Sequence, residues 1–343
     1  MKKNVAILFG GQSTEHEVSR VSATSVLNHI NNEKYNIYPI GITKEGKWFL
    51  YKGEYENIAS GQWEQDNENK VSNGLEVLVD KKVEVVFPVL HGMYGEDGTI
   101  QGLCKLMNIP CVGPSVMSSA VCMDKIYTKY LLEHGNIKQA KYVVVTTFDY
   151  KKDSSVFVKA IEENLGYPCF VKPANSGSSV GITKAHNREE LVKGLELALN
   201  HDRKVLVEEG LNAREIEVSV LGNDDPKASI PGEIIPAKEF YDYEAKYQNA
   251  ASKLLIPAAL PEEKLSIIRD LAVKIYKKLD CSGMARVDFL VDKDTEEVYL
   301  NEVNTIPGFT SISMYPKMWE ATGLSYPALI DELIELAIER NNS

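Results

Sequence analysis

Two short segments near the end of the chain constrain its fold more than any other feature of the 343 residues. Residues 284–289 read Met-Ala-Arg-Val-Asp-Phe, and residues 298–304 read Val-Tyr-Leu-Asn-Glu-Val-Asn. Both segments have the length and composition of β-strands, and Asp-Lys-Asp-Thr at 292–295 is a turn sequence between them. The sequence therefore predicts an antiparallel hairpin that brings one face of each strand together.

The facing sides of this predicted hairpin carry polar side chains. Because successive residues of a strand point to opposite faces, Arg286 and Asp288 share one face, and Glu302 and Asn304 share a face of the other strand. Such hard oxygen ligands suit Mg²⁺ better than zinc, and a Mg²⁺ with few protein ligands usually completes its shell with nucleotide phosphates. The alternative is a solvated hairpin, since polar outward faces are ordinary in a one-sided sheet.

Length and composition limit the class of protein. A chain of 343 residues is long enough for two or three domains, and 44% hydrophobic residues are ordinary for a soluble globular protein. A net charge of -11 argues against a general nucleic-acid binder, and no stretch approaches the roughly 18 apolar residues of a membrane span. The five cysteines are odd in number and widely spaced in apolar contexts. We therefore expect buried thiols and a cytoplasmic location.

Strands alternate with helices in the first third of the chain. Residues 4–9 form an apolar run before a glycine turn and a helix, and residues 83–90 precede a glycine-rich loop and a helix over 99–107. Residues 109–112 are expected to form the next strand. This alternation predicts a parallel sheet, and polar residues just after such strands lie where α/β sheets bind ligands. Glu15 and His91 are therefore candidate ligand contacts. Alternatively, Glu15 favours a helix N-terminus and His91 is an ordinary loop histidine.

A loop rich in glycine and serine lies in the middle of the chain. It spans residues 174–181 and joins a strand at 170–173 to another at 182–184. A P-loop instead leads into a helix and has its lysine after the glycines, whereas Lys172 precedes them here. The backbone N–H groups of such a loop can still hold phosphate oxygens, although a simple flexible turn is the alternative.

Three further segments have distinct patterns. A strand over 204–209 ends in two glutamates, although most acidic clusters of this kind are solvated faces. Residues 236–256 have no clear period and are long enough for an active-site lid. An amphipathic helix over 327–340 is predicted to pack against the rest of the protein as a terminal strap.

Six motifs in collinear order, covering nearly the whole chain, closely resemble the D-alanine:D-alanine ligases of the ATP-grasp superfamily. They lie at residues 10–19, 90–99, 122–125, 171–181, 240–247 and 301–311. The resemblance implies an α/β protein, α+β overall, with the ATP-grasp fold. It implies an N-terminal parallel-sheet domain over 1–122 and two α+β domains, over 123–212 and 213–343, that clasp the nucleotide.

The same resemblance implies ATP and two Mg²⁺ (or Mn²⁺) ions as cofactors. For the nucleotide it implies phosphate contacts from Lys125 and Lys172, a contact from Ser179, an adenine pocket with Glu208, Glu209 and Leu211, a ribose contact from Glu215, and Lys246 on the lid. For the metal ions it implies the ligands Asp288, Glu302 and Asn304, which agrees with the interpretation of the hairpin.

The resemblance also implies where two D-alanine molecules bind. Glu15 is expected to bind the ammonium of the first, with His91 nearby, while Ser313 and Met314 lie near the second. The implied oxyanion contacts are Arg286 and the backbone N–H of Gly308, and the implied hydrogen-bonded triad is Glu15, Ser178 and Tyr247. The general base for the attacking amine stays open, and a homodimer is implied.

Three rival functions fit the sequence less well. Ligases that use D-serine or D-lactate tend to have an arginine after the Ser-x-Ser element, and lactate users lack the lid tyrosine, whereas this chain has Met314 and Tyr247. A non-catalytic nucleotide sensor is expected to lack a metal ligand or a phosphate lysine, and none is missing. A dinucleotide-dependent oxidoreductase needs a Gly-x-Gly-x-x-Gly turn, which the segment after Gly11 lacks. D-alanine is therefore the expected second substrate.

Overall fold

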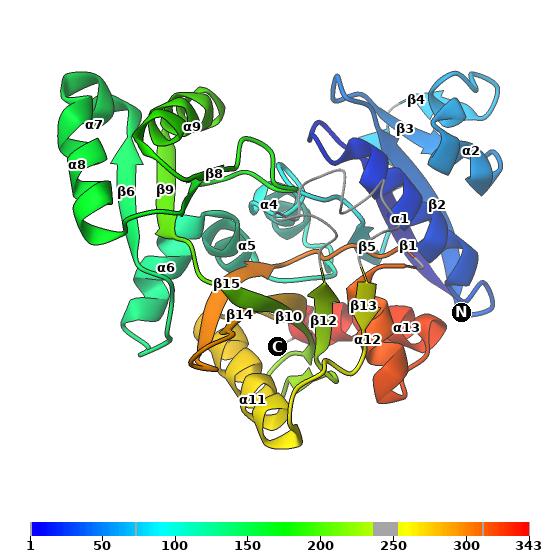
Figure 1. Ribbon diagram of the computed structural model, residues 1–343. Helices are drawn as coiled ribbons and strands as arrows, with labels where there is room; N and C mark the ends of the chain where they lie inside the picture. Colours follow the sequence, from blue (N-terminus) through cyan, green and yellow to red (C-terminus); the bar gives the residue numbers. More distant parts are fainter. Residues whose placement is uncertain (1, 73, 236–252, 311, 343) are drawn as a thin grey trace.

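Three separate β-sheets organise the protein in a computed structural model that describes residues 2–72, 74–235, 253–310 and 312–342 (Figure 1). The first and second sheets flank the third, so that segments far apart in sequence meet between them (Figure 1). Most of the predicted lid, residues 236–252, lies outside the described residues. The three-sheet architecture confirms the predicted fold class.

The first sheet has the order β4-β3-β2-β1-β5, and β1 pairs in parallel with both β2 and β5. This confirms the predicted parallel sheet, but β3 and β4 extend it as an antiparallel pair that the sequence did not predict. The strand predicted at 109–112 is only an isolated bridge between Val86 and Cys111. The elements are β1 (Lys3–Gly10), β2 (Tyr35–Ile42), β3 (Trp48–Tyr51), β4 (Lys70–Ser72), β5 (Val85–Pro88), α1 (His16–His29), α2 (Tyr55–Ser60), the 3₁₀ helix η1 (Gln62–Glu64), α3 (Gly74–Asp80), α4 (Thr99–Leu106) and α5 (Val116–Met123).

The second sheet is antiparallel, with the order β6-β9-β7-β8. The glycine- and serine-rich loop joins β7 to β8, as predicted. Asn187 caps α9 by accepting the backbone N–H of Glu190 at 3.0 Å, which fixes where that helix begins. The elements are α6 (Lys125–Glu133), β6 (Tyr142–Thr146), α7 (Thr147–Lys152), α8 (Ser154–Asn164), β7 (Cys169–Pro173), β8 (Thr183–Ala185), α9 (Arg188–His201) and β9 (Lys204–Glu209).

The third sheet contains the predicted hairpin. Its order is β13-β12-β10-β14-β15, with β11 paired to β10. Asp288 on β14 lies opposite Glu302 on β15, and Arg286 lies opposite Asn304, so the hairpin and its facing sides are confirmed. The elements are β10 (Ala213–Gly222), β11 (Lys227–Ala228), β12 (Gly232–Ile235), β13 (Lys253–Leu255), α11 (Glu262–Lys278), β14 (Gly283–Asp292), β15 (Val298–Asn304) and α12 (Met314–Thr322).

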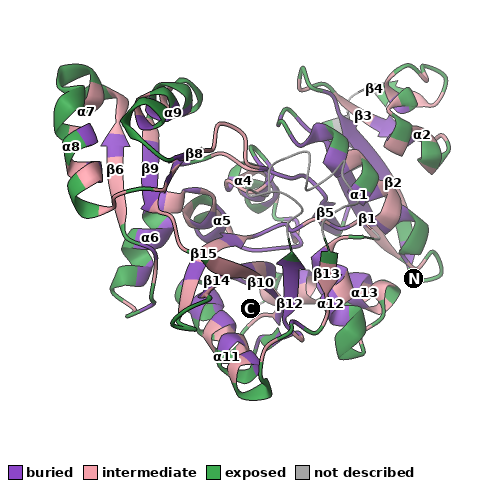
Figure 2. Ribbon diagram, viewed as in Figure 1, coloured by how far each residue is buried: buried purple, intermediate pink, exposed green. Residues whose placement is uncertain are grey.

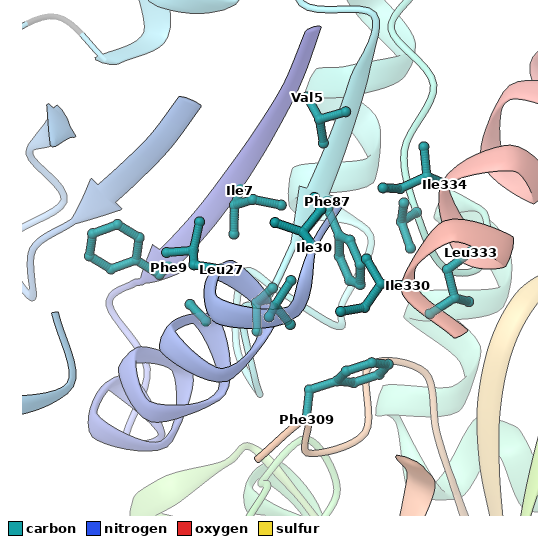
Figure 3. Close-up of a cluster of buried hydrophobic side chains, with 14 of the residues drawn as sticks. Val5, Ile7, Phe9, Leu27, Ile30, Phe87, Phe309, Ile330, Leu333 and Ile334 are labelled. Atoms are coloured by element: carbon teal, nitrogen blue, oxygen red, sulfur yellow. The ribbon is translucent and has the colours of Figure 1, made fainter. Parts of the chain in front are cut away.

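The last helix, α13 (Tyr326–Asn341), packs on the first sheet as the predicted strap. Figure 3 shows Ile330, Leu333 and Ile334 of this helix beside Val5 and Phe87 of the sheet, in one buried cluster. Phe309, from the turn after β15, joins the cluster, with its ring centroid 5.9 Å from that of Phe87. Burial of this apolar surface fixes the turn at 305–310 against the first sheet.

Burial follows the sheets. Figure 2 shows β9 and β12 as largely buried, while the outer faces of α8 and α9 are exposed. All five cysteines are buried and free of disulfides, as predicted. Among the residues that the structure describes, no helix combines the length and apolar character needed to cross a membrane.

Candidate active site

Glu15 lies where the first sheet meets the glycine- and serine-rich loop. It is the residue before α1, it is buried, and its carboxylate accepts a hydrogen bond from Ser178 Oγ. A Cβ on Gly92 or on Gly177 would lie 2.4 Å from Glu15 Oε2, so only glycine lets these two backbones approach the carboxylate. The structure thus brings together two members of the implied triad. Tyr247, the third, lies outside the described residues.

Both ring nitrogens of His91 have hydrogen-bond partners, and one of these partners lies in the turn after β15. Its Nδ1 donates to the carbonyl of Ile306 at 2.9 Å, and its Nε2 lies 2.9 Å from Ser22 Oγ, which also accepts the N–H of Phe309 at 3.3 Å. Burial lowers the pKa of His91, although Glu15 opposes this shift, so the imidazole is neutral and Nε2 accepts from Ser22. The direct substrate contact of His91 stays a prediction.

Glu96 links the turn after β15 to the loop after β5 through hydrogen bonds. One oxygen accepts the backbone N–H of Gly92 at 3.0 Å, and the other accepts the N–H of Ile306 at 2.8 Å. Burial, reinforced by the negative charge of Glu15, raises the pKa of Glu96 to about 7. The sequence analysis missed this residue, although it lies in the glycine-rich motif after β5.

Gly308 and Ser313 lie side by side. A Cβ on Gly308 would meet Ser313 Oγ at 2.9 Å, and Ser313 Oγ accepts the N–H of Thr310 at 3.0 Å. Met314 begins α12 and is buried with Ile234 and Met318 near the ends of the segment 236–252. The predicted oxyanion donor and the two predicted contacts of the second substrate are therefore neighbours.

The face of the β14–β15 hairpin holds an ion-pair network. Arg286 donates to Asp288 with two nitrogens, at 2.8 and 2.7 Å, and its Nε lies 3.0 Å from Glu217 on β10. Asn304 Nδ2 also donates to Asp288, at 2.9 Å. Burial opposes the charge of Arg286, but Asp288 and Glu217 outweigh it and raise its pKa. Arg286, the predicted oxyanion partner, is thus hydrogen-bonded to Asp288, a predicted metal ligand. This contact was not predicted from the sequence.

This donor set fits a Mg²⁺ ion that keeps phosphate or water ligands. Asp288 and Glu302 are cross-strand neighbours with Asn304 beside them, which places two carboxylates and an amide on one face. Within the described ranges no group of three His, Cys, Asp or Glu side chains could hold a metal ion, and the implied ligand set at the hairpin has two carboxylates and the amide of Asn304. A carboxylate accepts about four hydrogen bonds, and Arg286 and Asn304 donate three to Asp288, so these donors compete with a metal ion for the same oxygens.

The two predicted phosphate lysines lie across from the hairpin. Lys172 on β7 forms an ion pair with Glu208 at 2.5 Å, and its Nζ lies 3.5 Å from Asn301 Oδ1. Lys125, at the start of α6, donates to the carbonyl of Ser176 at 2.7 Å and lies 3.9 Å from Glu302. The structure therefore places both lysines beside the glycine- and serine-rich loop and the metal-ligand face.

The predicted adenine and ribose residues lie near the junction of β9 and β10. Glu208 is buried and paired with lysines, and Glu209 accepts the backbone N–H of Lys141 at 2.8 Å. Because both carboxylates have protein partners, an adenine contact here would use backbone groups near Leu211. Burial opposes the charge of Lys172, but Glu208, with smaller contributions from Glu302 and from Glu215 on β10, outweighs it and raises the pKa of Lys172. Ser179, in the glycine- and serine-rich loop, has a positive φ of 61°. Lys246 lies outside the described residues.

Four residues of this site were missed by the sequence analysis. They contact the predicted residues from other elements: Ser22, Glu96, Lys129 and Glu217. Only Lys129 had a local signal, because it follows Lys125 by one helical turn.

Two lysines, a glycine- and serine-rich loop and a carboxylate hairpin on facing antiparallel sheets define an ATP-grasp ligase. Residues 4–114 match the family D-ala D-ala ligase N-terminus, and residues 131–335 match D-ala D-ala ligase C-terminus. The chain belongs to the D-alanine–D-alanine ligase family.

Relatives and solved structures agree with this assignment. The chain is 70% identical to a D-alanine–D-alanine ligase of Clostridium acetobutylicum, covering 100% of each protein. It is 43% identical to the crystal structure of the VanG D-Ala:D-Ser ligase from Enterococcus faecalis, with a TM-score of 0.89 and coverage of 98% of this chain and 100% of that one. It is 37% identical to the D-alanine-D-alanine ligase from Coxiella burnetii, with a TM-score of 0.83 and coverage of 99% and 95%.

Proposed function

We propose that this chain joins two D-alanine molecules into D-alanyl-D-alanine, with hydrolysis of ATP to ADP and phosphate, for peptidoglycan precursors. The observation that carries the proposal is the Glu15–Ser178 hydrogen bond, which joins the predicted first-substrate site to the loop beside the two phosphate lysines. Full-length identity of 70% to a D-alanine–D-alanine ligase supports the same activity.

The proposed reaction begins with phosphoryl transfer to the carboxylate of the first D-alanine. Two anions must approach, so Lys125, Lys172 and Arg286 offset the repulsion by holding the phosphates and the carboxylate. Two Mg²⁺ ions, held by Asp288, Glu302 and Asn304, would neutralise phosphate charge when bound. Exclusion of water by the segment 236–256 would protect the resulting acyl phosphate from hydrolysis.

The second step is attack by the amine of the second D-alanine on the acyl phosphate. A carbon–nitrogen bond forms, the tetrahedral oxyanion faces Arg286 and the N–H of Gly308, and phosphate leaves with its bonding electrons. The amine must lose a proton, and neutral His91 is already hydrogen-bonded on both ring nitrogens. We assign no general base.

D-serine is the second candidate for the second substrate, because one solved structure that matches the whole chain is a D-Ala:D-Ser ligase. In this chain Met314 is buried in an apolar cluster and supplies no hydrogen-bond donor for the side-chain hydroxyl of D-serine. Against D-lactate, the chain has Tyr247, the lid tyrosine that lactate-using ligases lack. We therefore propose D-alanine over D-serine and D-lactate.

Phosphate release measured with ATP, Mg²⁺ and D-alanine tests the activity. We expect kcat/KM for D-alanine as second substrate to exceed that for D-serine or D-lactate by at least about tenfold. The side-chain hydroxyl of D-serine lacks a partner in an apolar pocket, and the hydroxyl of D-lactate is a weaker nucleophile than a free amine. Equal or better use of D-serine would overturn the substrate choice. Failure to release phosphate under conditions where ATP binds would overturn the ligase activity itself.

Replacing Gly177 by alanine tests the role of Glu15. The added Cβ would lie 2.4 Å from Glu15 Oε2 and must displace the carboxylate that is proposed to bind the first ammonium. We expect KM for the first D-alanine to rise about tenfold or more, with a smaller change in KM for ATP. Gly102 is the matched control, because a Cβ there meets no atom within 4 Å. A rise confined to KM for ATP would place the loop at the nucleotide instead.

The remaining parts of the proposal rest on the family resemblance. They are a homodimer, a cytoplasmic location and three functional domains over 1–122, 123–212 and 213–343. The domain limits are supported by the sheets, since each sheet draws its strands from one of these ranges.

A further inference from the structure

Lys129 is a buried cation that the proposed mechanism does not use. It lies on α6 one turn after Lys125, and its side chain is 4% exposed. Its Nζ lies 2.6 Å from Glu208 Oε1, 3.4 Å from the carbonyl of Ala140 and 5.1 Å from the centre of the Tyr142 ring. Three partners thus hold its ammonium group in the protein interior.

Glu208 is shared between two lysines. Its Oε1 contacts Lys129 and its Oε2 contacts Lys172, at 2.6 and 2.5 Å. Burial alone would raise the pKa of Glu208, but Lys172 and Lys129 outweigh it and lower the pKa to about 2. The carboxylate is therefore ionised at neutral pH and needs a cation at all times.

Lys172 and Lys129 differ in their exposure and in the groups around them. The Lys172 side chain is 15% exposed and its Nζ lies 3.5 Å from Oδ1 of Asn301, the residue before the predicted metal ligand Glu302, whereas Lys129 faces the interior. If Lys172 turns to a phosphate, Glu208 keeps Lys129. Without Lys129, the same movement would leave a buried carboxylate with no cation, which is strongly unfavourable.

We propose that Lys129 is a positioning residue that holds the charge of Glu208 so that Lys172 can transfer to a nucleotide phosphate. The inference rests on the proposed nucleotide site and adds a residue to it. Lys129 acts through Glu208 and does not touch the nucleotide.

Titration of Mg·ATP into the protein without D-alanine tests the inference, because no turnover occurs and binding is measured directly by calorimetry. Replacing Lys129 by methionine removes the charge and keeps much of the side-chain volume. We expect Kd for Mg·ATP to rise about 10- to 100-fold, because moving Lys172 now leaves Glu208 unpaired. Lys138→Met is the matched control, since Lys138 pairs with Glu297 on the surface, and its Kd should stay at the wild-type value.

The double variant Lys129→Met/Glu208→Gln separates this role from the alternatives. Glu208 is itself a predicted adenine-pocket residue, so the reference for the double variant is the single variant Glu208→Gln. With the carboxylate removed, Lys172 no longer needs a substitute cation, so Kd of the double variant should lie within about threefold of that of Glu208→Gln. A double variant that binds more than about threefold more weakly than Glu208→Gln would mean that Lys129 contacts the nucleotide or serves packing only, and would overturn the inference. Wild-type affinity in Lys129→Met would overturn it too.

Two controls keep the outcome decisive. If Lys129→Met does not fold, as judged by circular dichroism, the comparison of the double variant with Glu208→Gln decides, because neither of these two variants contains an unpaired buried carboxylate. If the wild-type protein fails to bind Mg·ATP, the proposed function fails, and that result is distinct from failure of the role of Lys129.

Discussion

Replacing Arg286 by alanine is expected to lower kcat about 10²- to 10³-fold, the usual effect of removing one oxyanion donor. Arg286 is the cation on the hairpin face, and in the structure Asp288 and Glu217 hold its guanidinium in place. The variant also leaves these two carboxylates without their cation, so we expect it to unfold more easily by about 3–5 kcal/mol. Urea unfolding monitored by circular dichroism measures this loss separately from steady-state kinetics.

Mg²⁺ dependence should distinguish Arg286 from its neighbours. Arg286→Ala removes two of the donors on Asp288, so the Mg²⁺ concentration at half-maximal activity should stay equal or fall. Glu302→Gln removes a proposed ligand, so the same concentration should rise several-fold. Arg286→Lys keeps the charge without the planar fork and should lie between wild type and Arg286→Ala in kcat. If Arg286→Ala and Glu302→Gln showed the same defect, the separate roles of oxyanion partner and metal ligand would be wrong.

The hairpin shows how far the sequence could predict this site. Alternation of side chains and a short turn determine which residues share a face, and the observed pairs, Asp288 with Glu302 and Arg286 with Asn304, follow from that local pattern. The same pattern does not determine side-chain partners. Arg286 reaches Glu217 on a third strand, and strand order was not predictable from two neighbouring segments.

The residues that the sequence analysis missed form contacts between distant parts of the chain. Glu96 binds the N–H of Ile306, which is 210 positions away, and Ser22 contacts the N–H of Phe309, which is 287 positions away. The local sequence around each of these polar residues gives no sign of its contact. Their roles arise because α13 and Phe309 pack on the first sheet and bring the turn after β15 to the loop after β5. Such contacts depend on the completed core, so no local period or spacing indicates them.

Replacing Glu96 by glutamine is expected to abolish a pH dependence of folding stability. The pKa of Glu96 is about 7 in the fold against an ordinary value of 4.5, so folding favours its protonated form. Its stabilising contribution is complete below pH 4.5 and is lost as pH rises to about 7, a change of up to about 3 kcal/mol. Urea unfolding at pH 5 and pH 7.5 measures it. The difference between the two pH values should be smaller in Glu96→Gln by up to this amount.

The same substitution should change catalysis through the turn that carries Gly308. Ionised Glu96 accepts N–H groups from both Gly92 and Ile306. Glutamine has one acceptor oxygen, so its NH₂ group would face the other N–H as a second donor, and that N–H would lose its acceptor. We expect kcat to fall about tenfold at pH 8, with KM for ATP nearly unchanged, because one buried N–H loses its partner.

The acid side of the pH–rate profile gives a second, independent measurement of this role. Glu15 and Arg286 are the charged groups that face Glu96, the first raising its pKa and the second lowering it. In the wild type, protonation near pH 7 weakens one of the two N–H contacts, so kcat should fall as pH drops through 7, and this limb should be missing in Glu96→Gln. Asp97→Asn is the matched control, because Asp97 accepts N–H groups from residues close to it in sequence, Tyr94 and Thr99. An acid limb that persists unchanged in Glu96→Gln would assign it to another group and leave Glu96 with a purely structural role.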